Sequence, residues 1–314
     1  MPNTFLFPGQ GAQYPGMGKD LYDANDSVKD LFRRANEHVP FKLEEVIFDG
    51  TEEDLRATDK TQVAVTITSL AAALVLKERG VGADRAAGFS LGEYAALTEA
   101  GVLAPEDVLP LVKIRGEVME AASRALDSDA GRAGMIAVMG LDLDTIRRTL
   151  EDNDFSDAFP SMANSPVQTV VSGTAEGLTR AQDILKEAGA KRVIPLKVSG
   201  PFHTPLMEDA RKEFEKAVRD VTFADPKIPV YSNVTGDLIS SGSEAQELCL
   251  RQLITTVMWT KEEESLLRDG PGRLLEVGPG TVLSGLWKAF AKDRDVADVA
   301  VEPAGTLEQI QAIA

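Results

Sequence analysis

The order of predicted strands and helices constrains this chain more than any other feature of its sequence. Short apolar runs alternate with segments of helical spacing before residue 127, and the alternation resumes after residue 196. Such alternation predicts a parallel sheet with helices on both faces. The intervening segment opens with the polar, glycine-containing run DSDAGRAG, which is typical of a boundary. The sequence therefore predicts an α/β core formed by residues 1–126 and 197–314, interrupted by an inserted subdomain at residues 127–196.

The core elements carry ordinary start and stop signals. Gly101 follows a helical segment where a C-terminal glycine is expected, and Thr204 with Pro205 forms a helix start. We expect core strands at 4–7, 85–88, 228–232 and 274–277. We expect core helices at 25–39, 61–79, 91–100, 105–126, 206–219, 245–254 and 282–292.

The inserted segment has its own order of elements. We expect a strand at 135–139, a helix at 142–151, strands at 161–164 and 168–172, a helix at 174–188 and a strand at 192–196. This β-α-β-β-α-β order is that of a ferredoxin-like unit. The predicted fold class is thus α/β, a doubly covered parallel-sheet core with a ferredoxin-like insert.

Charge and cysteine content limit the classes of partner. The 314 residues carry 33 Lys and Arg against 50 Asp and Glu, a formal net charge of -17. Nucleic acid is therefore not an expected partner, because phosphate binding needs a basic surface. The single cysteine, Cys249, sits among leucines and is expected to be buried. The apolar stretch Ile67–Leu76 is too short to span a bilayer and the N-terminus has no basic leader, so we expect a cytoplasmic protein without a membrane partner.

A candidate nucleophile lies in the run Gly88-Phe89-Ser90-Leu91-Gly92. It fits G-x-S-x-G and falls between a predicted strand and a predicted helix, the context in which this motif lifts a serine hydroxyl above a sheet. The following helix N-terminus favours negative charge developing near Ser90. A glycine-serine loop that merely caps a helix would give the same letters, but the flanking elements favour the catalytic interpretation.

A serine nucleophile needs a base, and the sequence offers two histidines. His38 ends a charged helix, where it is expected to cap carbonyls or face solvent. His203 lies in a loop between a strand and a capped helix, at the sheet edge where doubly wound folds build their sites. We therefore expect His203 to be the base. No acidic residue stands out as a third member, so we expect a dyad whose imidazole is oriented by backbone carbonyls.

Two further features suggest binding groups and leave alternatives open. The turn Gly9-Gln10-Gly11 after the first strand can aim backbone N–H groups at an oxyanion, or it is simply a tight turn. It is no dinucleotide fingerprint, because Tyr14 stands where the third glycine belongs. Arg115 lies among apolar helix positions that include Met119. A buried arginine needs an anion, and an internal salt bridge to an acid such as Glu93 or Glu117 is the simpler interpretation from these residues alone.

Several blocks together resemble the malonyl-CoA:acyl carrier protein transacylases. They occur in that family's order over nearly the whole chain, which makes the resemblance far more specific than G-x-S-x-G alone. The blocks are 7–13 (FPGQGAQ), 90–94 (SLGEY), Arg115-Gly116, Asn164-Ser165-Pro166, 198–207 (VSGPFHTPLM), 231–236 (YSNVTG) and 276–280 (EVGPG).

The resemblance implies a role for each matching residue. Ser90 would carry a malonyl ester and His203 would act as general base and acid. Backbone N–H groups of Gln10 and Leu91 would form the oxyanion hole, and Arg115 would pair with the malonyl carboxylate. The main-chain carbonyl of Gln252 would steady the histidine; Met119, Phe202 and Asn164 would line the substrate site. The implied fold is an α/β-hydrolase-like core with a ferredoxin-like subdomain.

The chain departs from the family pattern at two places. Phe89 stands where the family usually has a histidine before the serine, which bears on acyl preference rather than on the base. Pro201 and Thr204 flank the catalytic histidine where alanine and serine are common. Phe202 before His203 resembles malonyl-selective members, whereas related enzymes for branched acyl groups usually have serine there.

The implied reaction is a ping-pong transfer of malonyl from malonyl-CoA to the phosphopantetheine thiol of acyl carrier protein. It needs no metal and no permanently bound cofactor. A serine thioesterase or ester hydrolase, a polyketide acyltransferase with another acyl preference, and a non-catalytic nucleotide-binding module are the alternatives. Since acyl carrier proteins are generally acidic, as this chain is, we expect a local basic patch formed by Lys191, Arg192, Arg211 and Lys212.

Overall fold

The core of the protein is built on a parallel sheet. The computed structural model describes residues 1–196, 198, 200–296 and 298–313. Within this part of the chain the core strands are β1 (Asn3–Phe7), β2 (Arg85–Gly88), β7 (Arg273–Glu276) and β8 (Val301–Pro303), in the order β2-β1-β7-β8 with every pair parallel. The predicted α/β class with a parallel-sheet core is confirmed.

Side chains of β1 alternate between two separate apolar clusters, so the sheet is buried on both faces. Phe5 and Phe7 pack in one cluster with residues of helices α4, α5 and α6, whereas Leu6 packs in the other with Trp259 and Trp287. This explains why β1 is continuously apolar rather than alternating, since both faces of a doubly covered strand lie in the core.

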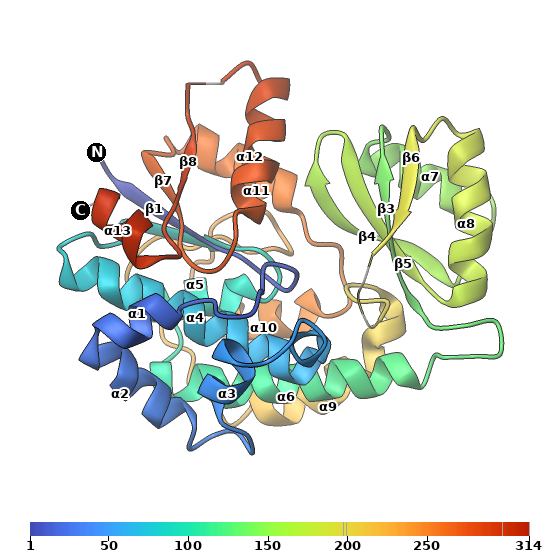
Figure 1. The fold of residues 1–314 in the computed structure, drawn as a ribbon. Helices are drawn as coiled ribbons and strands as arrows, with labels where there is room; N and C mark the ends of the chain where they lie inside the picture. The colour runs from blue at the N-terminus through green and yellow to red at the C-terminus, as the bar shows by residue number, and fades with distance from the viewer. Residues whose placement is uncertain (197, 199, 297, 314) are drawn as a thin grey trace.

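Helices surround this sheet in the layers seen in Figure 1. Among the described residues the core helices are α1 (Lys19–Ala24), α2 (Asp26–Ala35), α3 (Leu43–Phe48), α4 (Thr58–Glu78), α5 (Gly92–Glu99), α6 (Pro105–Arg124), α9 (Glu208–Val218), α10 (Gly242–Gln252), α11 (Trp259–Arg268), α12 (Val282–Asp293) and α13 (Leu307–Ile313). Helix α4 is long and apolar enough to cross a membrane, but 83% of its most apolar window is buried inside the protein. It is therefore explained as the central helix of the core.

The inserted segment forms its own antiparallel sheet. Its strands are β3 (Gly134–Met139), β4 (Ala158–Ser165), β5 (Gln168–Gly173) and β6 (Arg192–Pro195), in the spatial order β4-β5-β3-β6. Helices α7 (Leu143–Glu151) and α8 (Ala175–Glu187) pack on one face through a small apolar cluster that includes Ile136 and Val171. This is the ferredoxin-like element order that the sequence predicts, and Figure 1 shows it beside the core.

The opposite face of the small sheet is turned toward the core. Met135 belongs to the main core cluster, whereas its neighbour Ile136 packs under the subdomain helices. Alternate residues of one strand thus serve two different environments, as the period of two requires. The subdomain therefore presents an apolar sheet face, not helices, to the rest of the protein.

The structure differs from several of the predicted elements. The strand expected at 228–232 is reduced to isolated bridges, Ala86 to Val230 and Tyr231 to Leu238. Pro229 has no N–H to give to a ladder, and the chain turns away directly after these bridges. Helix α9 is preceded by a 3₁₀ turn, Pro205–Met207. Helices α1, α3, α11 and α13 and strand β8 were not expected. Lys197, where the second core segment was predicted to begin, and Ser199 of the 198–207 block lie outside the described residues.

Candidate active site

Ser90 lies on a tight turn that requires glycine at both 88 and 92. Strand β2 ends at Gly88 and helix α5 begins at Gly92, and Ser90 between them has a φ of 51°. A Cβ on Gly88 would lie 2.1 Å from the Gly92 carbonyl oxygen, and a Cβ on Gly92 would lie 2.0 Å from the Phe7 carbonyl oxygen. Backbone approach this close excludes any side chain, so the two glycines of G-x-S-x-G are required sterically.

The Ser90 hydroxyl meets the imidazole of His203. Its Oγ lies 2.7 Å from His203 Nε2, and His203 Nδ1 lies 2.7 Å from the main-chain carbonyl oxygen of Gln252. Because a carbonyl only accepts, Nδ1 carries the proton and Nε2 is left as an acceptor for the serine proton. The structure brings together the two residues that the sequence singled out, with a backbone carbonyl orienting the imidazole.

The imidazole is held neutral by its surroundings. His203 is 2% exposed. Burial first, and then the positive charge of Arg115, lowers the pKa of His203 to about 3. A neutral imidazole beside a hydroxyl is the protonation state that a general base needs at physiological pH.

Arg115 is a buried cation without a carboxylate in contact. It is 1% exposed, and no ion pair to it is found in the described part of the chain. Its Nη1 donates to Gln62 Oε1 at 2.9 Å, and its Nη2 donates to Gln252 Oε1 at 3.0 Å. Its Nε has no partner among the described residues. The internal salt bridge considered from the sequence is not found among the described residues: Glu117 pairs with Lys113, and Glu93 accepts from the Gln252 amide.

The loop after β1 lies against the serine turn. A Cβ on Gly9 would meet the Phe89 carbonyl oxygen at 2.3 Å, and the Phe89 N–H donates to the Phe7 carbonyl at 2.9 Å. Within the described residues no acceptor takes the main-chain N–H of Gln10 or that of Leu91. Two N–H donors without an acceptor therefore lie in the two segments that meet at this contact, one in each.

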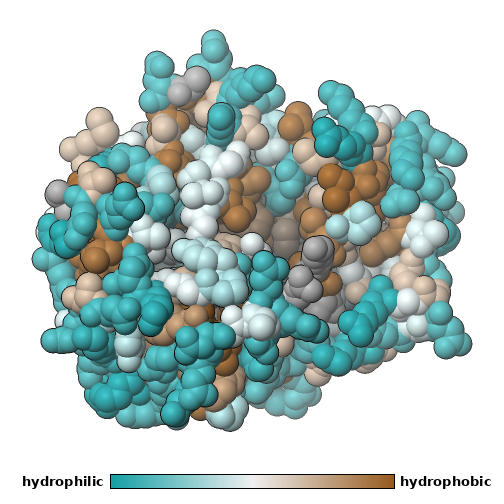
Figure 2. All heavy atoms as spheres, viewed as in Figure 1, coloured by the Kyte–Doolittle hydropathy of each residue, from teal (hydrophilic) through white to brown (hydrophobic). Residues whose placement is uncertain are grey.

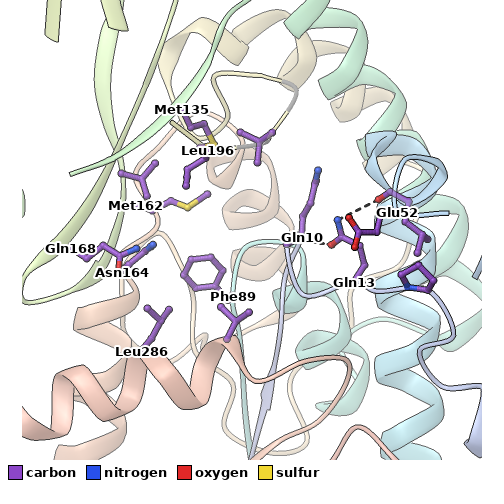
Figure 3. A pocket seen from close by; sticks show the side chains of 16 residues that line it. Gln10, Gln13, Glu52, Phe89, Met135, Met162, Asn164, Gln168, Leu196 and Leu286 are labelled. Atoms are coloured by element: carbon purple, nitrogen blue, oxygen red, sulfur yellow. Dashed lines mark hydrogen bonds between the residues drawn. The ribbon is translucent and has the colours of Figure 1, made fainter. Parts of the chain in front are cut away.

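A cleft of about 440 Å³ opens between the core and the subdomain. Figure 2 shows it as a hollow in which apolar side chains gather, and in Figure 3 Met135, Met162 and Leu196 face Phe89 and Leu286 across it. Gln10 and Phe89 line this cleft, so it reaches the serine turn, although Ser90 and His203 do not line it themselves. The cleft therefore ends against the residue that precedes Ser90.

The remaining predicted site residues fall in two groups. Asn164 lines the cleft, and its Oδ1 has no partner among the described residues. Met119 and Phe202 are 1% and 4% exposed and belong to the core cluster; the Met119 sulfur contacts the Gln62 amide at 3.6 Å. These two side chains do not line the cleft, because their helix and loop turn them into the core behind it.

The predicted basic patch is divided by ion pairs. Arg211 is paired with Glu208 at 2.8 Å and with a second carboxylate of the same helix, and Lys212 is paired with Asp209 at 3.3 Å. Lys191 and Arg192 are exposed, and neither forms an ion pair within the described residues. Free positive charge therefore lies at the start of β6 and not on α9.

Sequence reasoning missed the polar network behind the serine. Its members are Gln62, Glu93, Asn233 and Glu262, all buried. The Gln252 amide donates to Glu93 and to the Ser90 carbonyl, and burial raises the pKa of Glu93 to about 7. The 231–236 block carries part of the family resemblance, but its spacing gives no sign that Asn233 contacts Ser90.

Fold and site together define a class: α/β enzymes that act through a serine hydroxyl beside a neutral imidazole. The family model described as the acyl transferase domain matches residues 4–309, and the chain belongs to that family. It is 39% identical over 307 residues to a malonyl CoA-acyl carrier protein transacylase of Bacillus subtilis, covering 97% of this chain and 95% of the relative. It is 36% identical over 293 residues to one from Haemophilus influenzae, covering 92% of each chain.

Solved structures agree with this assignment. An acyl carrier protein S-malonyltransferase from Vibrio cholerae has a TM-score of 0.92 at 34% identity, with all of both chains covered. A malonyl-transacylase in complex with its type II PKS acyl-carrier protein has a TM-score of 0.91 at 34% identity, covering 99% of this chain and 98% of that one.

Proposed function

We propose that the protein transfers malonyl from malonyl-CoA to the phosphopantetheine thiol of acyl carrier protein through a malonyl-Ser90 intermediate. The malonyl CoA-acyl carrier protein transacylases of Bacillus subtilis and Haemophilus influenzae are similar to this chain over nearly its whole length. The observation that carries the proposal is the 2.7 Å contact of Ser90 Oγ with His203 Nε2 beside an Arg115 that contacts no carboxylate in the described chain. Fatty acid biosynthesis in the cytoplasm is the expected setting.

In the first half-reaction Ser90 Oγ attacks the malonyl thioester carbonyl while His203 Nε2 takes its proton. The N–H groups of Gln10 and Leu91 bind the oxyanion of the tetrahedral intermediate. The C–S bond breaks, His203 returns the proton to the departing sulfur, and free coenzyme A leaves. The carrier thiol then attacks the acyl-serine carbonyl and gives its proton to His203. The bond between the acyl carbon and Ser90 Oγ breaks, and His203 returns the proton to Oγ, which regenerates Ser90. All of this chemistry is supplied by the protein's own residues.

Arg115 makes the site selective for a carboxylated acyl group. Of its five N–H donors, Gln62 and Gln252 use one on each terminal nitrogen, leaving the Nε–H and one further N–H on each terminal nitrogen. A malonyl carboxylate satisfies this fork, whereas an acetyl group leaves a buried cation without an anion.

Intact mass measurement after treatment with malonyl-CoA tests the proposal. We expect one malonyl adduct per chain, mapped to the peptide that contains Ser90, and its loss on adding holo carrier protein as the carrier gains the same mass. Ser90→Ala is the matched control and gives no adduct. Rapid release of free malonate without any carrier would instead indicate a thioester hydrolase.

We propose further that the carrier docks near the start of β6. An acidic carrier is attracted by unpaired cations, and Lys191 and Arg192 supply them, whereas Lys212 is already paired with Asp209. Lys191→Glu with Arg192→Glu is expected to raise the KM for the carrier and leave the KM for malonyl-CoA nearly unchanged. Lys212→Glu is the comparison and should change the carrier KM less. Equal effects of the two charge reversals would remove β6 as the docking site.

A further inference from the structure

The side-chain amide of Asn233 contacts the serine turn at two points, Ser90 and Gly88. Its Oδ1 accepts the main-chain N–H of Ser90 at 2.6 Å, and its Nδ2 donates to the carbonyl of Gly88 at 2.6 Å. Asn233 is completely buried. One amide therefore ties the residue that ends β2 to the residue that carries the hydroxyl.

Glu262 supports the orientation of this amide from behind. Asn233 Nδ2 also donates to Glu262 Oε1 at 2.8 Å, and the main-chain carbonyl of Asn233 accepts from the Met258 N–H at 2.7 Å. A flipped amide would set its NH₂ against the Ser90 N–H and its oxygen against two acceptors. Only one orientation satisfies all three contacts, so Glu262 stabilises the orientation that the serine turn requires.

The turn needs such support because its backbone is strained. Ser90 has a φ of 51°, in the left-handed region, which costs a non-glycine residue about 1–3 kcal/mol. The Ser90 carbonyl is held as well, by the Gln252 side-chain amide at 2.9 Å. Both polar backbone groups of Ser90 are thus bound by buried side-chain amides from distant parts of the chain.

The hydrogen bond between Asn233 and Ser90 also decides which main-chain N–H groups are free for the reaction. The Ser90 N–H is occupied by Asn233 and cannot bind an oxyanion, whereas the N–H groups of Leu91 and Gln10 have no acceptor among the described residues. The geometry points to Asn233, seated on Glu262, as a positioning residue that holds Ser90 in its left-handed turn and assigns the oxyanion site to Leu91 and Gln10. This inference rests on the proposed function, in which Ser90 is the nucleophile.

Variants of Asn233 and Glu262 distinguish a role in positioning Ser90 from a role in stabilising the fold. Asn233→Ala removes the amide, and Asn233→Asp keeps an acceptor for Ser90 but loses both donated bonds. Glu262→Leu removes the acceptor without touching the serine turn, and Glu262→Gln restores one. Asn36→Ala is the matched control, because Asn36 also bridges two groups through its side chain, donating to Glu44 at 2.8 Å and accepting from the Leu43 N–H at 2.9 Å, away from the cleft.

The readouts are the single-turnover rate of Ser90 malonylation, the KM for malonyl-CoA, and thermal unfolding. We expect Asn233→Ala and Asn233→Asp to slow malonylation about 100-fold with little change in KM, because small displacements of a reacting group cost this much. We expect Glu262→Leu to slow malonylation less, Glu262→Gln to recover most of that loss, and Asn36→Ala to keep the wild-type rate.

Malonylation at the wild-type rate in folded Asn233→Ala overturns the inference while leaving Ser90 as the nucleophile. If Asn233 variants fail to fold, the Glu262 pair decides: equal rates for Glu262→Leu and Glu262→Gln overturn it. Absence of any adduct on Ser90 in the wild-type protein overturns the proposed function instead, so the two failures are distinguishable.

Discussion

Replacing Arg115 by methionine is the sharpest test of acyl selectivity. Methionine fills much of the same volume in an apolar environment and removes the charge together with every N–H donor. The guanidinium is 1% exposed, and its Cζ lies 5.3 Å from the centre of the Tyr94 ring. The substitution therefore changes the electrostatics of a closed site rather than a solvated surface charge.

The expected magnitude follows from the donors that Arg115 leaves free. A hydrogen bond to a charged group contributes about 1.5–3 kcal/mol, so a carboxylate bound by two of them is stabilised by about 3–6 kcal/mol. At about 1.4 kcal/mol per factor of ten, Arg115→Met should lower kcat/KM for malonyl-CoA by about 10²–10⁴-fold. Acetyl-CoA has no carboxylate to lose, so its kcat/KM should stay level or rise.

The assay is serine acylation by malonyl-CoA and acetyl-CoA in parallel, read as the ratio of the two kcat/KM values. Arg124→Met is the control on the same helix, since Arg124 is an exposed residue paired with Glu120 at 2.7 Å. The control should leave the ratio unchanged. An Arg115→Met protein that keeps the wild-type ratio would refute the argument that Arg115 receives the malonyl carboxylate.

Three further outcomes follow from the site. Because the pKa of His203 is lowered to about 3, the acid limb of kcat/KM should lie below the ordinary histidine value of 6.5; a pH–rate profile with a limb at or above 6.5 contradicts this. Gly92→Ala should lower the free energy of unfolding by several kcal/mol or prevent folding, because its Cβ meets the Phe7 carbonyl oxygen at 2.0 Å. Gly285→Ala in helix α12, where a Cβ meets nothing within 4 Å, should raise it by about 0.5–1 kcal/mol. Urea unfolding measures both, and similar effects at the two glycines would be inconsistent with the packing. Burial, then the neighbouring Glu93, raises the pKa of Glu262 well above its ordinary value, so the folded state keeps a proton that the unfolded state releases, and wild-type stability falls as pH rises. Glu262→Gln lacks this loss, so its free energy of unfolding relative to wild type should increase from pH 5 to pH 8; a constant difference would show that the carboxyl does not titrate on unfolding.

Much of the fold could be predicted because its signals are local. The strand-helix alternation, the β-α-β-β-α-β order of the insert and the G-x-S-x-G turn are all written in short windows of sequence. The short strand β8 and helix α13 were missed because the pairing of β8 with β7 and the packing of α13 depend on neighbours distant in the chain.

Only part of the site could be predicted, because some of its contacts join residues that are distant in the chain. Ser90 and His203 could be chosen from one motif and from the scarcity of histidines. The partners of Arg115 could not be chosen in this way, because an arginine among apolar helix positions fits an internal salt bridge as well as a ligand. Only the structure shows that the guanidinium meets two neutral amides, from Gln62 and Gln252, which lie far away in the sequence.

The sequence by itself determined the α/β class, through its alternation of strands and helices. It also determined the serine turn, since glycines at 88 and 92 permit a backbone approach that no other residue allows. Tertiary structure alone decided what surrounds that turn. The contacts of Asn233 and Gln252 with Ser90 span 143 and 162 residues of chain. Hydrogen bonds over such separations are set by how the sheet and helices pack, and no local pattern of residues encodes them.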